Sequence, residues 1–186
     1  GFVFQNFNLI SHQSVLENVK MPLYVKNMTD KEMAEIAERE LSRLGIGDFI
    51  KKNVKQLSGG QKRRVCIASL LAIDPGIVIL DEPTAGLDAV GKKWMKALIS
   101  SLNQQGKTVI WISHDMSEVA ELARRVIVLE QGRIILDGDT ADIFSCEDQL
   151  AASGLEIPHA ARLVRELKSK GVPIPGKAVT VAGAFN

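Results

Sequence analysis

The stretch Ile77-Val78-Ile79-Leu80-Asp81-Glu82 decides the fold, because four apolar residues run directly into two adjacent carboxylates. A run this apolar is too short for a surface helix and is typical of a fully buried strand in a parallel sheet. Proteins with α/β folds place their ligands at the carboxyl ends of the strands, which is where these carboxylates lie. The stretch therefore predicts a buried parallel strand with an acidic site at its end.

Helical and strand patterns alternate on both sides of this strand. Thr29 followed by Glu32 forms a capping box at the start of one helix, and Gly45 follows that helix as a C-cap. The predicted elements are a strand end over 2–4, helices over 29–44 and 59–72, a helix over 89–102, a buried strand over 108–112, a helix over 115–124, a hairpin of 126–129 with 133–136, and a helix over 158–170. This alternation indicates an α/β fold with a mostly parallel sheet.

Composition describes an ordinary globular chain. Its 186 residues are enough for one domain with an ample core, and 46% of them are hydrophobic. The 23 basic and 22 acidic residues leave a net charge of +1, which predicts no nucleic-acid partner. No apolar run approaches the roughly 18–20 residues that span a bilayer, so we expect any membrane role to come through partners. Cys66 and Cys146 lie far apart, which favours a reducing cytosol over a disulfide framework or a zinc site.

The segment Ser58-Gly59-Gly60-Gln61 allows two interpretations at the start of the helix over 59–72. Ser58 and Gln61 form a capping box, which is a purely structural role. However, a glycine inside a helix costs roughly 1 kcal/mol relative to alanine, so capping alone does not call for two. Three cations at residues 62–64 also lie in the first turn, where the helix dipole disfavours positive charge. A phosphate bound at this helix start would remove the conflict, and we favour that interpretation.

Asp81 and Glu82 have the chemistry that phosphoryl transfer requires. The alternative is a solvated turn before Pro83. In phosphoryl transfer one carboxylate binds Mg²⁺ and a second acceptor orients the attacking water. We assign the first role to Asp81 and the second to Glu82.

Three further polar residues are candidates for the same site. His114 follows the strand over 108–112, so we expect it at the same sheet edge and in contact with the γ-phosphate. Gln5 follows the first strand, at that edge too, and is predicted to sense Mg²⁺ or water. Asp88 is either a nucleotide-site residue or simply the N-cap of the next helix.

A complete phosphate loop of the form G-x-x-x-x-G-K-[ST] does not occur in these 186 residues. Two segments come near it, at 86–93 and 171–178, but both lack the hydroxyl that binds Mg²⁺. Neither segment lies between a strand and a helix, as the motif requires. We interpret both as coincidences.

Taken together, these motifs resemble the nucleotide-binding domain of ABC transporters. Gln5, Leu57-Ser58-Gly59-Gly60-Gln61, residues 77–82, residues 85–88 and Ser113-His114-Asp115 resemble the Q-loop, signature, Walker B segment, D-loop and H-loop, in that order. The resemblance implies a three-layer α/β fold of the P-loop NTPase kind with a helical signature subdomain and a small C-terminal helical extension. Its predicted organisation is a partial ATPase domain over 1–146, with the helical subdomain at about 14–72, and an extension over 147–186.

The resemblance also implies a function and partners. It implies ATP and Mg²⁺ as ligands and a homo- or heterodimer of ATPase subunits, in which the signature of one closes on the Walker A loop of the other. It implies transmembrane transporter subunits and a peripheral location on the cytoplasmic face of the membrane. The Walker A loop should precede Gln5, and the chain opens on the strand-like Gly1-Phe2-Val3-Phe4. We therefore expect the sequence to begin inside the domain and the chain alone to be inactive.

The subfamily is predicted from two segments that disagree. Ser153-Gly154-Leu155-Glu156-Ile157-Pro158, with Leu163, Leu167 and Gly171, is similar to the C-terminal extension of energy-coupling-factor ATPases, which drive uptake of vitamins or of cobalt and nickel ions. Residues 4–9 and 14–19 look more like amino-acid importers or lipoprotein-releasing ABC ATPases. We favour the energy-coupling-factor interpretation, because an appended segment is more specific than a shared loop.

Three other functions are compatible with parts of this pattern. An ABC ATPase of DNA repair or chromosome organisation would need a long coiled coil between Gln5 and Ser58, and only about fifty residues without sustained heptads lie there. A degenerate regulatory module has no chemical need for Glu82 and His114. A noncatalytic fragment, functional only within its full-length parent, is the interpretation we favour for the isolated chain.

Overall fold

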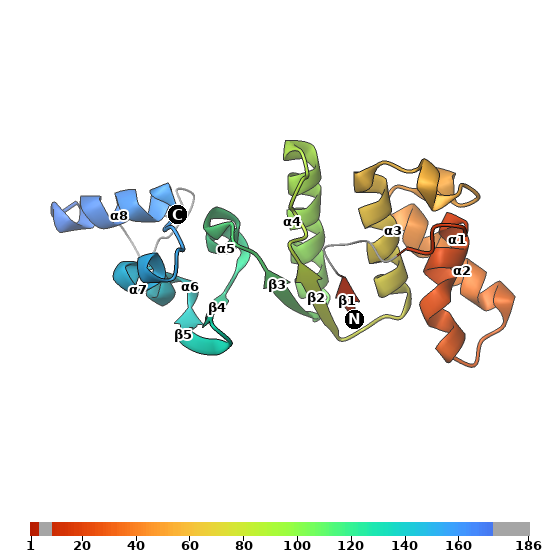
Figure 1. Cartoon of the computed structure of the whole chain (residues 1–186), viewed down its shortest axis with the longest axis horizontal. Helices are drawn as coiled ribbons and strands as arrows, with labels where there is room; N and C mark the ends of the chain where they lie inside the picture. The colour runs from red at the N-terminus through yellow and green to blue at the C-terminus, as the bar shows by residue number, and fades with distance from the viewer. Residues whose placement is uncertain (4–8, 173–186) are drawn as a thin grey trace. The chain divides into compact units, whose positions relative to one another are not determined.

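The structure is a computed structural model that describes residues 1–3 and 9–172. The chain divides into two compact units, Gly1–Ile112 and Ser113–Asn186. Each unit is described by itself below, and its elements carry the labels of Figure 1.

A parallel sheet forms the centre of the first unit. Its strands are β1 (Phe2–Val3), β2 (Ile77–Asp81) and β3 (Thr108–Ile112), in the order β1-β2-β3. The central strand β2 pairs in parallel with both neighbours, and Asp81 lies opposite Ile112 in the register with β3. The predicted strands at 77–80 and 108–112 and their parallel pairing are therefore confirmed, and β1 matches the predicted strand end over 2–4 as far as residue 3, since residue 4 lies outside the described residues. The carboxyl ends of β2 and β3 meet at one edge of the sheet, beside the predicted acidic pair.

Burial of these strands differs from the sequence prediction. Val78 and Leu80 are fully covered, as expected, but Ile77, Ile110 and Ile112 are about half exposed. Alternate residues of a strand point to opposite faces, and α4 (Ala89–Gln104) packs against only one face of β3. The expectation that both strands are buried on both faces is wrong within the described residues.

Three helices of the first unit form a helical layer beside the sheet. They are α1 (Val15–Lys20), α2 (Asp30–Arg43) and α3 (Gly59–Ala72), joined by the short 3₁₀ turns η1 (Met21–Val25), η2 (Gly47–Phe49) and η3 (Val54–Gln56). Their buried core includes Val15, Val19, Leu23, Ala37, Leu41, Val65 and Ala68. The Thr29–Glu32 capping box at the start of α2 is confirmed, and Gly45 after α2 has the positive φ of a C-cap, 69°. In Figure 1, α3 lies between α1 and α2 and the sheet, which lets it connect the two layers.

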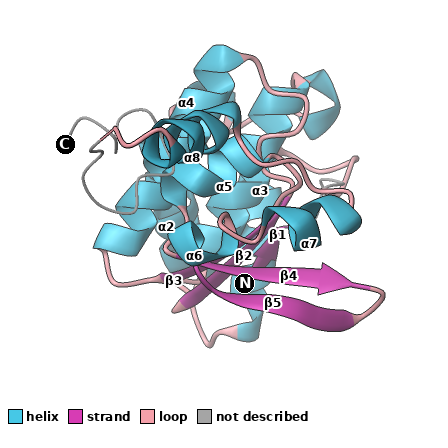
Figure 2. Ribbon diagram, turned by 90° about the vertical axis from the view of Figure 1, so that its left-hand side faces the viewer, coloured by secondary structure: helices cyan, strands magenta, loops and turns pink. Residues whose placement is uncertain are grey.

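The second unit is built on an antiparallel hairpin, visible in Figure 2 as the β4–β5 pair. Its elements are α5 (Met116–Leu122), β4 (Arg125–Glu130), β5 (Arg133–Asp139), α6 (Thr140–Ile143), α7 (Glu147–Ala152) and α8 (His159–Ser169). Gln131 and Gly132 both have positive φ, which is the geometry of a two-residue hairpin turn. This confirms the predicted hairpin.

One apolar cluster holds the second unit together. It contains Val119, Ala120, Val128, Ile143, Phe144, Leu150, Ile157 and Ala161. The cluster takes residues from both sides of position 146, where the sequence suggested the start of a C-terminal extension. That division stays a prediction. Nowhere in residues 1–3 and 9–172 does a helix combine the length and apolar character needed to cross a membrane.

Candidate functional site

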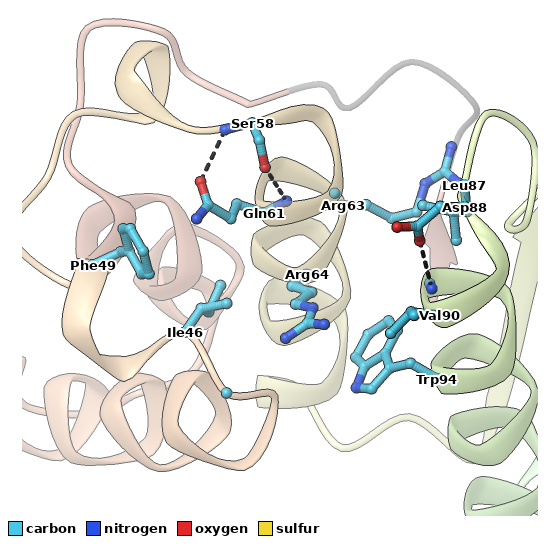
Figure 3. A pocket seen from close by; sticks show the side chains of 13 residues that line it. Ile46, Phe49, Ser58, Gln61, Arg63, Arg64, Leu87, Asp88, Val90 and Trp94 are labelled. Atoms are coloured by element: carbon cyan, nitrogen blue, oxygen red, sulfur yellow. Dashed lines mark hydrogen bonds between the residues drawn. The ribbon is translucent and has the colours of Figure 1, made fainter.

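The start of α3 is shaped by its capping box, which Figure 3 shows with dashed lines. The Ser58 hydroxyl accepts a hydrogen bond from the Gln61 amide at 3.3 Å, and the Gln61 side chain accepts one from the Ser58 amide at 2.9 Å. This satisfies the Gln61 amide but not those of Gly59 and Gly60, which also lie in the first turn. Ser58, Gly59 and Gly60 are all exposed. The helix therefore presents backbone donors to an incoming anion.

The two glycines are not required by the backbone of α3. Neither has positive φ, and a Cβ built on either one would meet nothing within 4 Å. Alanine would therefore fit the folded chain at both positions and would favour the helix. What glycine provides here is close access to the backbone, which is the property a phosphate site needs.

The cations in the first turn are held in a different way from the one the sequence suggested. The Arg63 side chain donates to the carbonyl oxygens of Pro83 and Ala85, and the Arg64 side chain donates to that of Leu44 at 3.2 Å. Arg64 also stacks on Trp94, with its guanidinium carbon 4.6 Å from the ring centroid. Burial lowers the pKa of Arg63 from its usual range. Carbonyl acceptors therefore stabilise both arginines without a bound anion, so the two arginines do not by themselves call for a phosphate at this helix start.

Asp81 and Glu82 lie at the carboxyl end of β2, as predicted. The Glu82 amide donates to the carbonyl oxygen of Ile112 at 3.0 Å, which ties the end of β2 to the end of β3. Glu82 has φ of +47°, a left-handed conformation that costs a non-glycine residue about 1–3 kcal/mol. Such strain persists only where the surroundings enforce it. The backbone conformation at Glu82 is therefore imposed by the fold.

Asp88 is the N-cap of α4. Its carboxylate accepts a hydrogen bond from the Gly91 amide at 2.7 Å. The N-cap interpretation of Asp88 is confirmed, and its contact with a nucleotide stays a prediction. The Asp88 carboxylate therefore stabilises the start of α4.

A pocket of about 300 Å³ connects these segments (Figure 3). Its polar side is formed by Ser58, Gln61, Arg63, Arg64 and Asp88. Its apolar side is formed by Ile46, Phe49, Leu87, Val90 and Trp94, none of which was predicted from sequence as a site residue. Only Trp94, an aromatic residue six positions after Asp88, carried a signal that could have been noticed. The start of α3 and the start of α4 therefore share one surface depression.

Two further predicted site residues, Gln5 and His114, are not among the residues that line this pocket. Gln5 lies outside the described residues. His114 is exposed and belongs to the second unit, two residues after the end of β3. Its proximity to the phosphate site stays a prediction.

Among the described residues, Asp81 is the one predicted to hold a magnesium ion, and it lies at the end of β2. Among the residues that the structure describes, no three His, Cys, Asp or Glu side chains are grouped as a metal cage. Magnesium in nucleotide sites is held by one or two carboxylates together with phosphates and waters, so a single carboxylate at the strand end fits that mode.

Comparison with known proteins shows the family to which this chain is similar. The family described as "ABC transporter" matches residues 1–85. A putative ABC transporter ATP-binding protein of Methanosarcina acetivorans is 40% identical over 176 residues, which cover 94% of this chain and 29% of that protein. The energy-coupling factor transporter ATP-binding protein EcfA1 of Ligilactobacillus salivarius is 43% identical over 182 residues, covering 97% of this chain and 64% of that protein.

Solved structures agree with the sequence relatives. The structure of cbiO1 from Clostridium perfringens, part of the ABC transporter complex cbiONQ, matches with a TM-score of 0.68 and 33% identity, covering 89% of this chain and 66% of that one. The ATP-binding cassette MJ0796, solved as a dimer bound to ADP and Pi, matches with a TM-score of 0.68 and 36% identity, covering 75% of this chain and 62% of that one.

The chain thus spans 29% of the length of the Methanosarcina acetivorans protein and 64% of the length of EcfA1. Its α/β fold is that of the ABC cassettes it matches, as the resemblance implied. The chain belongs to the ATP-binding domains of ABC transporters and is homologous to the energy-coupling factor transporter ATP-binding proteins.

Proposed function

We propose that these residues are part of the ATP-hydrolysing subunit of an energy-coupling-factor transporter that imports a vitamin or a transition-metal ion. The observation that carries this choice is how far the similarity extends. In sequence, EcfA1 aligns with 97% of the chain. Among the solved structures, cbiO1 covers 89% of the chain, whereas the MJ0796 cassette covers 75%. In the second unit, Ile157 and Ala161 from the end of the described chain are built into the core. This supports a C-terminal segment that is integral to the fold, as the energy-coupling-factor interpretation requires.

Each candidate residue has one role in the proposal. Ser58, with the amides of Gly59 and Gly60, contacts the terminal phosphate of ATP. Asp81 would hold Mg²⁺, which neutralises phosphate charge when bound. Glu82 orients the attacking water, and its enforced backbone keeps the carboxylate in place. His114 contacts the γ-phosphate.

Two residues complete the assignment. Gln5 senses Mg²⁺ or the water at the same edge. Asp88, fixed as the N-cap of α4, faces the pocket beside Ser58 and contacts the nucleotide site from there.

The proposal includes a second ATPase subunit. In this proposal residues 58–61 supply the signature side of a site, and no complete phosphate loop occurs in these 186 residues. We propose that a signature and a phosphate loop from two subunits close on one ATP, in a homo- or heterodimer. Transmembrane subunits would hold this dimer at the cytoplasmic face of the membrane. The relative MJ0796, which was solved as a dimer bound to ADP and Pi, supports a dimeric arrangement.

Titration calorimetry of the 186-residue chain with Mg-ATP tests the need for a phosphate loop. We expect no detectable heat of binding, because the phosphates of ATP have no loop to enclose them. Circular dichroism on the same sample must show helical signal, so that the result reports on binding and not on unfolding. Stoichiometric binding would show that a phosphate cradle exists among these residues, and the segment at 86–93 would then be the first place to search.

Co-purification tests the transporter type. The full-length protein, expressed with the membrane subunits of an energy-coupling-factor transporter, should be retained in detergent with them. The same membrane subunits without the protein, and the protein with subunits of an amino-acid importer, serve as controls. If the protein is retained by the amino-acid importer subunits and not by the energy-coupling-factor subunits, the protein belongs to an amino-acid importer instead.

Replacing Gly60 with alanine should separate stability from function. The added Cβ meets nothing within 4 Å, so we expect the free energy of unfolding to rise, by up to about 1 kcal/mol. The same methyl group fills the space that a phosphate needs, and ATP-dependent dimerisation of the full-length protein should weaken. Urea unfolding and light scattering with ATP measure the two effects.

Gly91 provides the contrast for this experiment. A Cβ at Gly91 would lie 3.0 Å from the Asp88 carboxylate and 3.2 Å from the Leu87 side chain. We therefore expect Gly91→Ala to lower the unfolding free energy. If Gly60→Ala stabilises the protein and leaves dimerisation intact, Gly60 does not face the nucleotide.

A further inference from the structure

The side chain of Arg63 joins the first turn of α3 to the segment that follows Glu82. Its Nη1 atom donates to the carbonyl oxygen of Pro83 at 2.7 Å and to that of Ala85 at 2.9 Å. Arg63 is only 8% exposed, and Pro83 is buried as well. Buried carbonyl groups need hydrogen-bond donors, and the Arg63 guanidinium supplies them to this turn.

The turn that Arg63 holds is the strained one. Glu82 is in the left-handed region, and the Ala85 amide donates back to the Glu82 carbonyl oxygen at 3.2 Å. The next bond runs from the Leu87 amide to the carbonyl oxygen of Thr84 at 3.1 Å. These local bonds close the turn but do not connect it to α3. Among the hydrogen bonds described above, those of Arg63 make that connection, and strained conformations need such additional restraint.

The other end of this connection is the candidate phosphate site. Arg63 lies one helical turn along α3 from Gly59 and Gly60, and the Asp88 end of the restrained segment lines the same pocket as Ser58. If a bound phosphate displaces α3, the charged hydrogen bonds of Arg63 would therefore move the backbone beside Glu82 as well.

We propose that Arg63 is a positioning residue, which couples the phosphate-facing start of α3 to the Glu82 turn. In this role it sets the place of the water-orienting carboxylate according to whether α3 is docked on a nucleotide. The inference rests on the proposed function, because it assigns Glu82 to the orientation of water. It goes beyond that function in linking phosphate contact at Ser58 with hydrolytic geometry at Glu82.

The variants Arg63→Met and Arg63→Lys test the coupling in the full-length protein. Methionine fills similar space without donors, whereas lysine keeps a charge and donors on a shorter stem. Since a misplacement of about 1 Å can cost roughly 100-fold in rate, we expect Arg63→Met to lower kcat by about that factor. The KM for ATP should stay unchanged, because the contacts at Ser58 remain. Arg63→Lys should recover part of the lost kcat.

A second readout does not depend on turnover. Hydrogen–deuterium exchange of the peptide over 82–88, measured without nucleotide, should be faster in Arg63→Met than in the wild type. Lys107→Met is the matched control, because the Lys107 amine donates to the Pro75 carbonyl at 3.0 Å and to Asp74 at 2.5 Å, at the opposite end of β2. That variant should leave kcat and the exchange of 82–88 unchanged.

The outcomes separate the inference from the function on which it rests. Unchanged exchange over 82–88 in Arg63→Met overturns the proposal, as does faster exchange with unaltered kcat. A parallel loss in kcat, KM and folded fraction assigns Arg63 to stability alone and also overturns it. If the wild-type protein has no ATPase activity, or if Glu82→Gln keeps full turnover, the proposed function is refuted. The catalytic part of the inference is then refuted too.

Discussion

Glu82→Gln in the full-length protein is expected to stall ATP hydrolysis while preserving ATP binding. Glutamine keeps the size and shape of the side chain but cannot accept the proton of the attacking water as a carboxylate does. General-base contributions are typically about 10²–10⁴-fold, and we expect turnover to fall within that range. The backbone of Glu82, with its bond to Ile112, does not depend on the side-chain carboxylate. Binding of ATP should therefore be retained.

The measurement is steady-state phosphate release together with the Kd for ATP. Glu38→Gln is the control. Glu38 is an exposed residue of α2, and its substitution makes the same chemical change outside the site. We expect that control to match the wild type in both quantities. Wild-type turnover in Glu82→Gln would remove Glu82 from the water-orienting role, whatever else the site does.

The elements predicted well from sequence are those with a local signal. The strand over 77–81 follows from its apolar run, and the helix over 59–72 from the capping box of Ser58 and Gln61. The shorter helices α1, α6 and α7 were not predicted, since four to six residues give too few turns for a periodic pattern. The length of an element therefore decided whether it was recognised.

No local sequence pattern predicts the contacts that organise the site. Arg63 finds its acceptors 20 and 22 residues along the chain, and no spacing rule connects these positions. For this reason the sequence suggested an anion where the fold supplies carbonyl groups. The left-handed conformation of Glu82 was equally unpredictable, because it is a non-glycine residue held by contacts with other segments. The identities of Asp81 and Glu82 were clear from sequence, and their restraint was visible only in the structure.

Ser58→Arg is expected to abolish ATP-dependent dimerisation. The substitution places a long charged side chain at the helix start that we propose faces the phosphate of a partner-bound ATP. It also removes the hydroxyl that accepts from the Gln61 amide, and loss of such a cap costs about 1 kcal/mol. Bulk at the contact should outweigh any gain from the added positive charge, since the amides of Gly59 and Gly60 need direct approach. Light scattering with ATP, in protein that also carries Glu82→Gln, measures the dimer without its loss through hydrolysis.

Two controls separate the contact from the cap. Thr29→Arg removes the equivalent cap of α2, where the Thr29 hydroxyl accepts from the Glu32 amide at 3.3 Å, and should leave dimerisation intact. Ser58→Asn keeps a capping acceptor with a small side chain, so it should restore part of the dimer that arginine abolishes. If Thr29→Arg and Ser58→Arg lose the dimer equally, general destabilisation explains both. A dimer undiminished in Ser58→Arg would refute the assignment of Ser58 to the nucleotide, since no phosphate could approach the helix start past that side chain.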